Sequence, residues 1–236
     1  MKCAAIRIAC LLLVLMTAAG IYAQVEEVVI MKKICAAYNT VDAISFNSDM
    51  KMYSGSNPKK IIEKSHSTYT LQGVNFICRS GSSIMLLNDK YCVAADNMLK
   101  LIVVGRRNHL SGTALLPVLN LVQLKSLVSK GKITASILTD NDKPVLQLAD
   151  PQEVSGCRLY KIAFDERSYF LKNVIVEIAD SKDADHKTMV LETSYSTPFA
   201  NQEKNKMFSE KTFFTIVRNR IVLAGNYKRY QIINQL

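Results

Sequence analysis

The chain has 236 residues, 49% of them hydrophobic, and its 30 basic and 20 acidic side chains give a formal net charge of +10. This length fits one domain with a sizeable core. The basic excess is spread thinly, without the dense stripe or reading motif that nucleic-acid recognition needs, so we expect no nucleic-acid partner.

The first 23 residues have the pattern of a secretory signal peptide. Lys2 and Arg7 precede the apolar run IACLLLVLMTAA, and Ala23 suits the last position removed by a signal peptidase. About a dozen apolar residues are too few to span the ~30 Å hydrocarbon core of a membrane. We therefore expect cleavage near Ala23, export as a soluble protein, and a single mature domain over residues 24–236.

The next segments predict a helix and then a half-buried strand. Residues 25–38 have apolar side chains at helical spacing, with Met31 and Tyr38 on the same face. In the run DAISFNSDMKMYS (42–54) the period changes to two, and apolar residues alternate with polar ones. Phe46, Met50 and Met52 share the apolar face of this strand.

Gly55-Ser56-Asn57-Pro58 predicts a turn, and a meander of strands is predicted after it. The runs EKSHSTYTL, NFICRS, SSIMLLN, KYCVAA and LKLIVVG resemble short strands, and turn-forming pairs such as Asn88-Asp89 separate them. Connections this short join antiparallel neighbours only, because a parallel crossover needs a dozen or more residues. The first half is therefore predicted to be an N-terminal helix followed by antiparallel strands.

The middle of the chain predicts an unusually apolar helix over residues 113–129. Leucine and valine occupy much of its circumference, which a helix packed on one face does not need. Pro117 would kink or split it, and Gly131 ends it. Strand-like runs return from residue 133 to residue 234, interrupted by the polar stretch PFANQEKNKMFSEK, which we interpret as a loop or excursion. The sequence thus predicts an α+β domain with one strongly twisted antiparallel sheet.

Motifs for catalysis are missing from the sequence. There is no GxSxG at a strand-to-helix turn and no glycine-rich phosphate loop. Adjacent carboxylates such as Asp165 and Glu166 lie in predicted turns, where solvated turn formers are common. We therefore expect no enzyme, no catalytic residue and no cofactor.

Four cysteines remain after cleavage, namely Cys35, Cys78, Cys92 and Cys157. Their even number allows disulfides in an oxidising compartment, but they are also suited to be small buried hydrophobic residues. If the meander is correct, one strand separates Cys78 from Cys92, too far for a bridge. No CxxC or HExxH motif occurs, so we expect no metal site.

The mid-chain helix has two interpretations. It is either an ordinary buried core helix or a lid over an apolar hollow on the sheet. Methionines suit both, because flexible thioethers fill gaps in cores and line adaptable ligand surfaces. For the lid, the candidate residues around the hollow are Phe46, Met50, Met52, Met85, Leu115, Leu119, Leu121 and Val122.

The order of these features resembles the periplasmic outer-membrane lipoprotein-carrier superfamily, that of LolA and LolB. The matching stretches are the exported N-terminus, the helix ending in CAAYNTV, the strand DAISFNSDMKMYS, the hairpins through NDKYCVAADNMLKLIVVG, the apolar insertion and GCRLYKIAFDERSYFLKNVIVEI. The resemblance implies a strongly curved antiparallel sheet, an incomplete β-barrel, with helices as a lid.

The same resemblance implies a soluble periplasmic carrier that binds an acyl chain, lipid or lipoprotein non-covalently and meets membrane-associated protein partners. The alternative is an envelope interaction or sensing module of the same fold, with a hollow filled by its own side chains and no lipid ligand. A connected apolar cavity between helix 113–129 and the sheet would favour the carrier.

Overall fold

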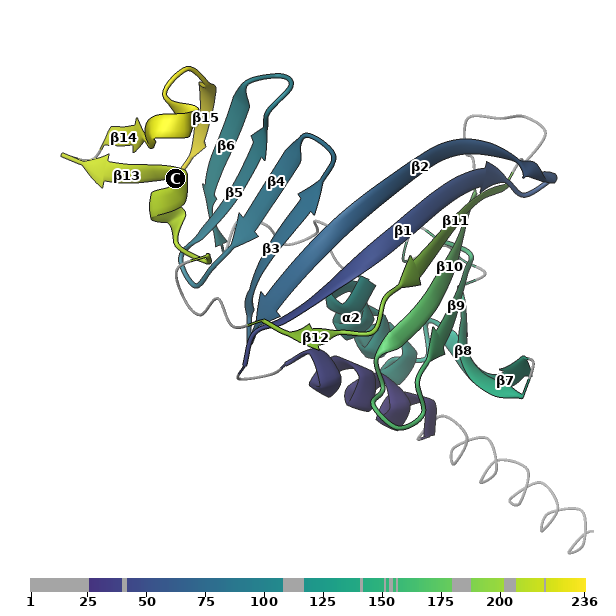
Figure 1. The fold of residues 1–236 in the computed structure, drawn as a ribbon. Coiled ribbons are helices and arrows are strands. Elements are labelled where there is room, and N and C mark those ends of the chain that lie inside the picture. Colours follow the sequence, from purple (N-terminus) through teal and green to yellow (C-terminus); the bar gives the residue numbers. More distant parts are fainter. Residues whose placement is uncertain are drawn as a thin grey trace, which may run out of the picture.

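The computed structural model describes residues 26–39, 42–107, 117–140, 142–150, 152, 155, 157–179, 188–201, 207–218 and 220–236 (Figure 1). The predicted signal peptide and Leu115 lie outside these residues, as do the side chains of Leu119 and Val122. Within the described residues, no helix has the length and apolarity needed to cross a membrane.

Strands dominate the described structure. An N-terminal helix covers residues 26–38. The remaining elements are β1 (Ile44–Ser54), β2 (Asn57–Gln72), β3 (Asn75–Ser80), β4 (Ser83–Leu87), β5 (Tyr91–Asp96), β6 (Leu101–Arg106), α2 (Pro117–Ser129), β7 (Thr134–Asp140), β8 (Lys143–Ala149), β9 (Leu159–Phe164), β10 (Leu171–Ala179), β11 (Thr188–Tyr195), β12 (Phe199–Ala200), β13 (Phe214–Val217), β14 (Arg220–Leu223) and β15 (Gln231–Gln235), with short 3-10 turns at Glu210–Thr212 and Gly225–Tyr227.

One large sheet contains most of these strands, in the order β15-β6-β5-β4-β3-β2-β1-β11-β10-β9-β8-β7. The predicted meander is confirmed, because β1 to β6 pair consecutively and antiparallel. The strand β15 departs from this pattern and lies parallel to β6. The long chain segment between those two strands supplies the crossover that parallel pairing requires.

Tight turns explain why the meander forms where it does. Gly73 and Gly81 have φ of 55° and 54° and connect β2 to β3 and β3 to β4. Only glycine adopts such angles without a steric penalty, so these two positions fix the hairpins and their register. The predicted turn at residues 55–58 is shorter in the structure, since β2 already begins at Asn57.

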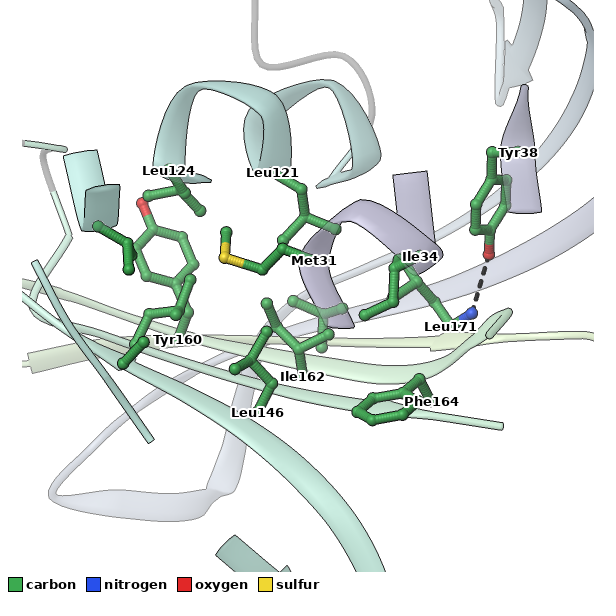
Figure 2. Packing of buried hydrophobic residues seen from close by; sticks show 14 of the residues in the cluster. Met31, Ile34, Tyr38, Leu121, Leu124, Leu146, Tyr160, Ile162, Phe164 and Leu171 are labelled. Atoms are coloured by element: carbon green, nitrogen blue, oxygen red, sulfur yellow. Dashed lines mark hydrogen bonds between the residues drawn. The ribbon is translucent and has the colours of Figure 1, made fainter. Parts of the chain in front are cut away.

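The larger core lies between the two helices and one face of the sheet. In Figure 2, Met31 and Ile34 of the N-terminal helix and Leu121 of α2 point toward Leu146 and Ile162. All five side chains are almost completely buried. The predicted apolar face of the N-terminal helix is therefore confirmed as the face that covers the sheet.

A second core covers the opposite face of β3 to β6. Adjacent residues of a strand point to opposite faces, so Phe76 belongs to the larger core and Ile77 to the second. The chain after residue 207 returns to this second face and buries Phe213, Phe214 and Tyr227 against it. The described side chains of the C-terminal segment therefore pack on the second face. They do not contribute to the larger core, on the face that the helices cover.

Candidate functional site

The helix α2 covers an apolar hollow of about 210 Å³. Leu121 and Leu124 line it from the helix and are 1% and 4% exposed. The other side of the hollow comes from β9, β10 and β11 and from Cys157, two residues before β9. Its lining residues there are Cys157, Tyr160, Ile162, Val174, Val176, Ile178, Leu191 and Thr193. Among the described lining residues, only Thr193 and Tyr160 carry a hydroxyl group and the rest are apolar side chains or Cys157, so this part of the hollow suits an apolar group.

A second and larger hollow of about 460 Å³ lies over β1 to β6. Its apolar lining includes Met50, Tyr69, Cys78, Met85 and Val103. Burial raises the pKa values of Tyr69 and Cys78, so both side chains stay protonated and neutral at pH 7. The α2 residues whose side chains are described do not line this hollow.

Strand register shows that the two hollows lie on the same face of the sheet and have neighbouring lining residues on β1 and β11. Met50 of β1 lines the larger hollow and pairs directly with Thr193 of β11, which lines the smaller one. Thr193 in turn pairs with Val174, and Val174 with Ile162. Directly paired residues share a face, so one row of side chains connects both hollows.

A row of small polar groups crosses the larger hollow. Ser67 of β2 pairs with Ser80, Ser80 with Ser83, and Ser83 with Asp96. Asp96 accepts hydrogen bonds from the Leu99 and Met98 amides and from two serine hydroxyls, and these bonds lower the pKa of its carboxyl group. The hollow therefore combines apolar walls with a hydroxyl-lined strip.

The structure brings together several of the predicted site residues. Met50 and Met85 line the larger hollow, and Leu121 lines the smaller one. Phe46 is instead a core residue, 1% exposed and stacked on Tyr69 with ring centroids 5.2 Å apart. Met52 has the same strand parity as Met50 but lines neither hollow.

Sequence reasoning missed the sheet side of the smaller hollow. Its alternating residues on β10, Val174, Val176 and Ile178, were visible as strand pattern. Alternation identifies the apolar face of a strand, but not the helix that lies over that face. The position of α2 above β9 to β11 is a tertiary feature without a local sequence signal.

Catalytic and metal chemistry find little support in the geometry. Across the described ranges, no group of three or more His, Cys, Asp or Glu side chains could hold a metal ion. His66 Nδ1 lies 2.8 Å from Asp49 Oδ1, but both side chains are largely exposed. Catalytic acid–base pairs typically lie in desolvated clefts, so this pair gives no candidate active site.

Cys35, Cys78, Cys92 and Cys157, the cysteines of the described residues, form no disulfide in the structure. Cys78 lies on β3 and Cys92 on β5, with β4 between them, as predicted. Cys35 and Cys157 both pack against the larger core, because the N-terminal helix covers the second half of the sheet, but they do not form a bridge.

No protein-family model and no curated protein matches the chain. Similar solved structures include an uncharacterized conserved protein from Thermus thermophilus (6% identity, 87% of this chain and 97% of the other, TM-score 0.48). A putative outer membrane lipoprotein-sorting protein domain from Vibrio parahaemolyticus is 10% identical (78% and 96% covered, TM-score 0.39). A LolA superfamily protein from Nitrosomonas europaea is 8% identical (76% and 96% covered, TM-score 0.26).

The Nitrosomonas europaea structure is named as a member of the LolA superfamily. With TM-scores below 0.5 and identities of 10% or less, the three structures carry no argument about the ligand of this chain. The ligand preference of this chain follows from the side chains that line its own hollows.

Proposed function

We propose that this protein is a soluble exported carrier that binds the acyl chain of a lipid or lipoprotein non-covalently, with α2 as the lid of an incomplete, strongly curved β-barrel. The observation that carries the proposal is the apolar hollow between Leu121 and Leu124 of α2 and the strands β9 to β11. The larger hollow lies on the same face of the sheet, and its lining residue Met50 pairs with Thr193 of the smaller hollow, so a longer ligand would extend from one hollow toward the other.

The volumes are consistent with a small amphiphile. Ligand sites typically measure about 300–1,000 Å³. The larger hollow, at about 460 Å³, falls in this range, whereas the smaller one, at about 210 Å³, holds only part of such a ligand. Because each buried CH₂ contributes about 0.8 kcal/mol, an acyl chain needs an apolar surface and little specific chemistry to bind.

Displacement of a fluorescent fatty acid, together with native mass spectrometry after detergent-free purification, tests the proposal. We expect a bound amphiphile in the native spectrum and displacement of the probe by fatty acids. The variant Val176→Phe places a larger side chain in the smaller hollow and should weaken binding about tenfold or more.

Ile175→Phe is the matched control, because Ile175 is the neighbour of Val176 on β10 and points to the opposite face. Thermal unfolding of both variants establishes that they are folded. The carrier proposal would be contradicted if the protein is always ligand-free and fatty acids displace no fluorescent probe from it. Equal loss of binding in the two variants would contradict the assignment of the hollow.

One observation favours the alternative, an envelope interaction or sensing module with no lipid ligand. Leu121, Leu124 and Val128 of α2 are already buried in the same core as Met31. A helix packed in this way can be ordinary core, with its hollow closed to ligands. This alternative predicts no fatty-acid displacement and a membrane-associated protein partner that crosslinks to the intact protein.

A further inference from the structure

The turn between β5 and β6 presents two large apolar side chains to solvent. Met98 is 80% exposed and Leu99 is 71% exposed, more than any other large hydrophobic residue in the described part of the chain. Adjacent exposed side chains of this size are unfavourable in water and mark interaction sites more often than isolated ones.

Hydrogen bonds hold this turn in a defined conformation. Asp96 Oδ1 accepts from the backbone amides of Met98 at 2.8 Å and Leu99 at 2.9 Å. The Tyr230 hydroxyl donates to Asn97 Oδ1 at 2.7 Å and so attaches the turn to the C-terminal segment. The two apolar side chains therefore project from a fixed support.

Lys100 follows the exposed pair in the chain, and a second basic segment contacts the turn. The Gln231 amide donates to the Lys100 carbonyl oxygen at 2.8 Å, and the Lys100 ammonium lies 5.1 Å from the centre of the Tyr230 ring. These contacts bring exposed Lys228 and Arg229 next to the turn, and in Figure 1 the loop before β15 lies at the same end of the sheet as the turn between β5 and β6.

Acidic residues offset this positive charge only in part, because Asp96 contributes a single negative charge beside Lys100, Lys228 and Arg229. The sequence contains no Asp or Glu after Glu210. The carboxylate within the turn, Asp96, is engaged by two amides and by the hydroxyls of Ser82 and Ser83. An apolar tip with a cationic surround is complementary to the surface of an anionic lipid bilayer, where side chains enter the interface and cations meet the headgroups.

We propose that the β5–β6 turn is a membrane-docking element, in which Met98 and Leu99 insert into the interface of an anionic bilayer while Lys100, Lys228 and Arg229 bind its headgroups. Asp96 and Leu101, which flank the turn, also line the larger hollow. Docking therefore sets the rim of that hollow against the membrane. The proposal does not depend on either hollow binding lipid, because Met98, Leu99 and the three basic residues line neither hollow.

Vesicle cosedimentation of the full chain, purified from the soluble exported fraction, tests this element. The probes are vesicles of phosphatidylcholine alone and with about one third phosphatidylglycerol, at low and at high salt. We expect binding to the anionic vesicles that decreases with salt. Met98→Ser combined with Leu99→Ser should weaken it at least tenfold, and Lys228→Gln combined with Arg229→Gln about twenty-five-fold, at about fivefold per charge.

Val74→Ser is the matched control, because Val74 is 58% exposed in the turn between β2 and β3, at the opposite end of the strands. Unchanged thermal unfolding is expected for all variants, since exposed substitutions usually shift stability by less than about 0.5 kcal/mol.

Several results would overturn the proposal. Wild-type protein that binds neither vesicle excludes docking. Binding that Val74→Ser reduces as much as the Met98 and Leu99 variant excludes this turn as the contact. Self-association in ultracentrifugation that the Met98 and Leu99 variant abolishes, without vesicle binding, assigns the surface to a second copy of the chain.

Discussion

Leu121 tests how firmly α2 is attached to the sheet. Its side chain is 1% exposed and points toward Ile162 in the larger core (Figure 2). Leu121→Ala removes buried apolar atoms and enlarges the adjacent hollow, and such substitutions in cores cost about 3 kcal/mol, within a range of about 2–5 kcal/mol. In a domain of this size about 1 kcal/mol shifts the melting temperature by about 2–4 °C, so we expect a decrease of about 6–12 °C.

Thermal unfolding followed by circular dichroism measures this effect. Ser126→Ala is the matched control, because Ser126 is exposed on the same helix and its replacement should change stability by less than about 0.5 kcal/mol. If Leu121→Ala lowers the free energy of unfolding by less than about 1 kcal/mol, the packing of α2 on the sheet is refuted. Leu121→Asp should be far more harmful, since a carboxylate would be buried without a partner.

Ligand addition extends the same experiment. A fatty acid at about one hundred times its dissociation constant should stabilise the folded protein by about 2.7 kcal/mol. The carrier proposal predicts this gain in the wild type and also in Leu121→Ala, whose hollow is enlarged. No gain in either protein would favour the interaction module.

Three further predictions concern other parts of the molecule. The Tyr38 hydroxyl accepts a hydrogen bond from the buried Leu171 amide at 3.0 Å (Figure 2), so Tyr38→Phe should cost about 1–3 kcal/mol in chemical denaturation. Burial raises the pKa of the Cys92 thiol to about 11, so Cys92 should react with a thiol reagent at pH 8 only on unfolding, and non-reducing peptide mapping should find no Cys78–Cys92 bridge. Hydrogen bonds, above all from Lys172, lower the pKa of Asp165 in the folded protein. The ionised carboxylate therefore stabilises the folded state above about pH 4, and this contribution is lost as the pH falls further. The melting temperature of Asp165→Asn should thus fall less between pH 7 and pH 3 than that of the wild type.

The local elements could be predicted because their signals are local. The alternation in residues 42–54 corresponds to β1, and the short runs punctuated by Gly73 and Gly81 correspond to β2, β3 and β4. The helical spacing of Met31 and Tyr38 identified the buried face of the N-terminal helix. Side-chain periodicity and turn geometry depend on neighbours within a few residues, which a single sequence contains.

The candidate site could be predicted only in part. Met50, Met85 and Leu121 were found because flexible or excess apolar side chains are visible in the sequence. Phe46 is buried in the larger core and stacked on Tyr69, and its place around a ligand stays a prediction. Val174, Val176 and Thr193 were missed, because their role depends on which helix lies above them.

Local sequence patterns predict the N-terminal helix and the antiparallel meander, and the sequence lacks catalytic motifs. Tertiary packing places β15 parallel to β6, sets the C-terminal segment on the second face, and brings Tyr230 to Asn97 in the turn between β5 and β6. These contacts join residues about 130 positions apart. Long-range pairing is selected by the burial of whole faces, a property of the assembled sheet that no local pattern encodes.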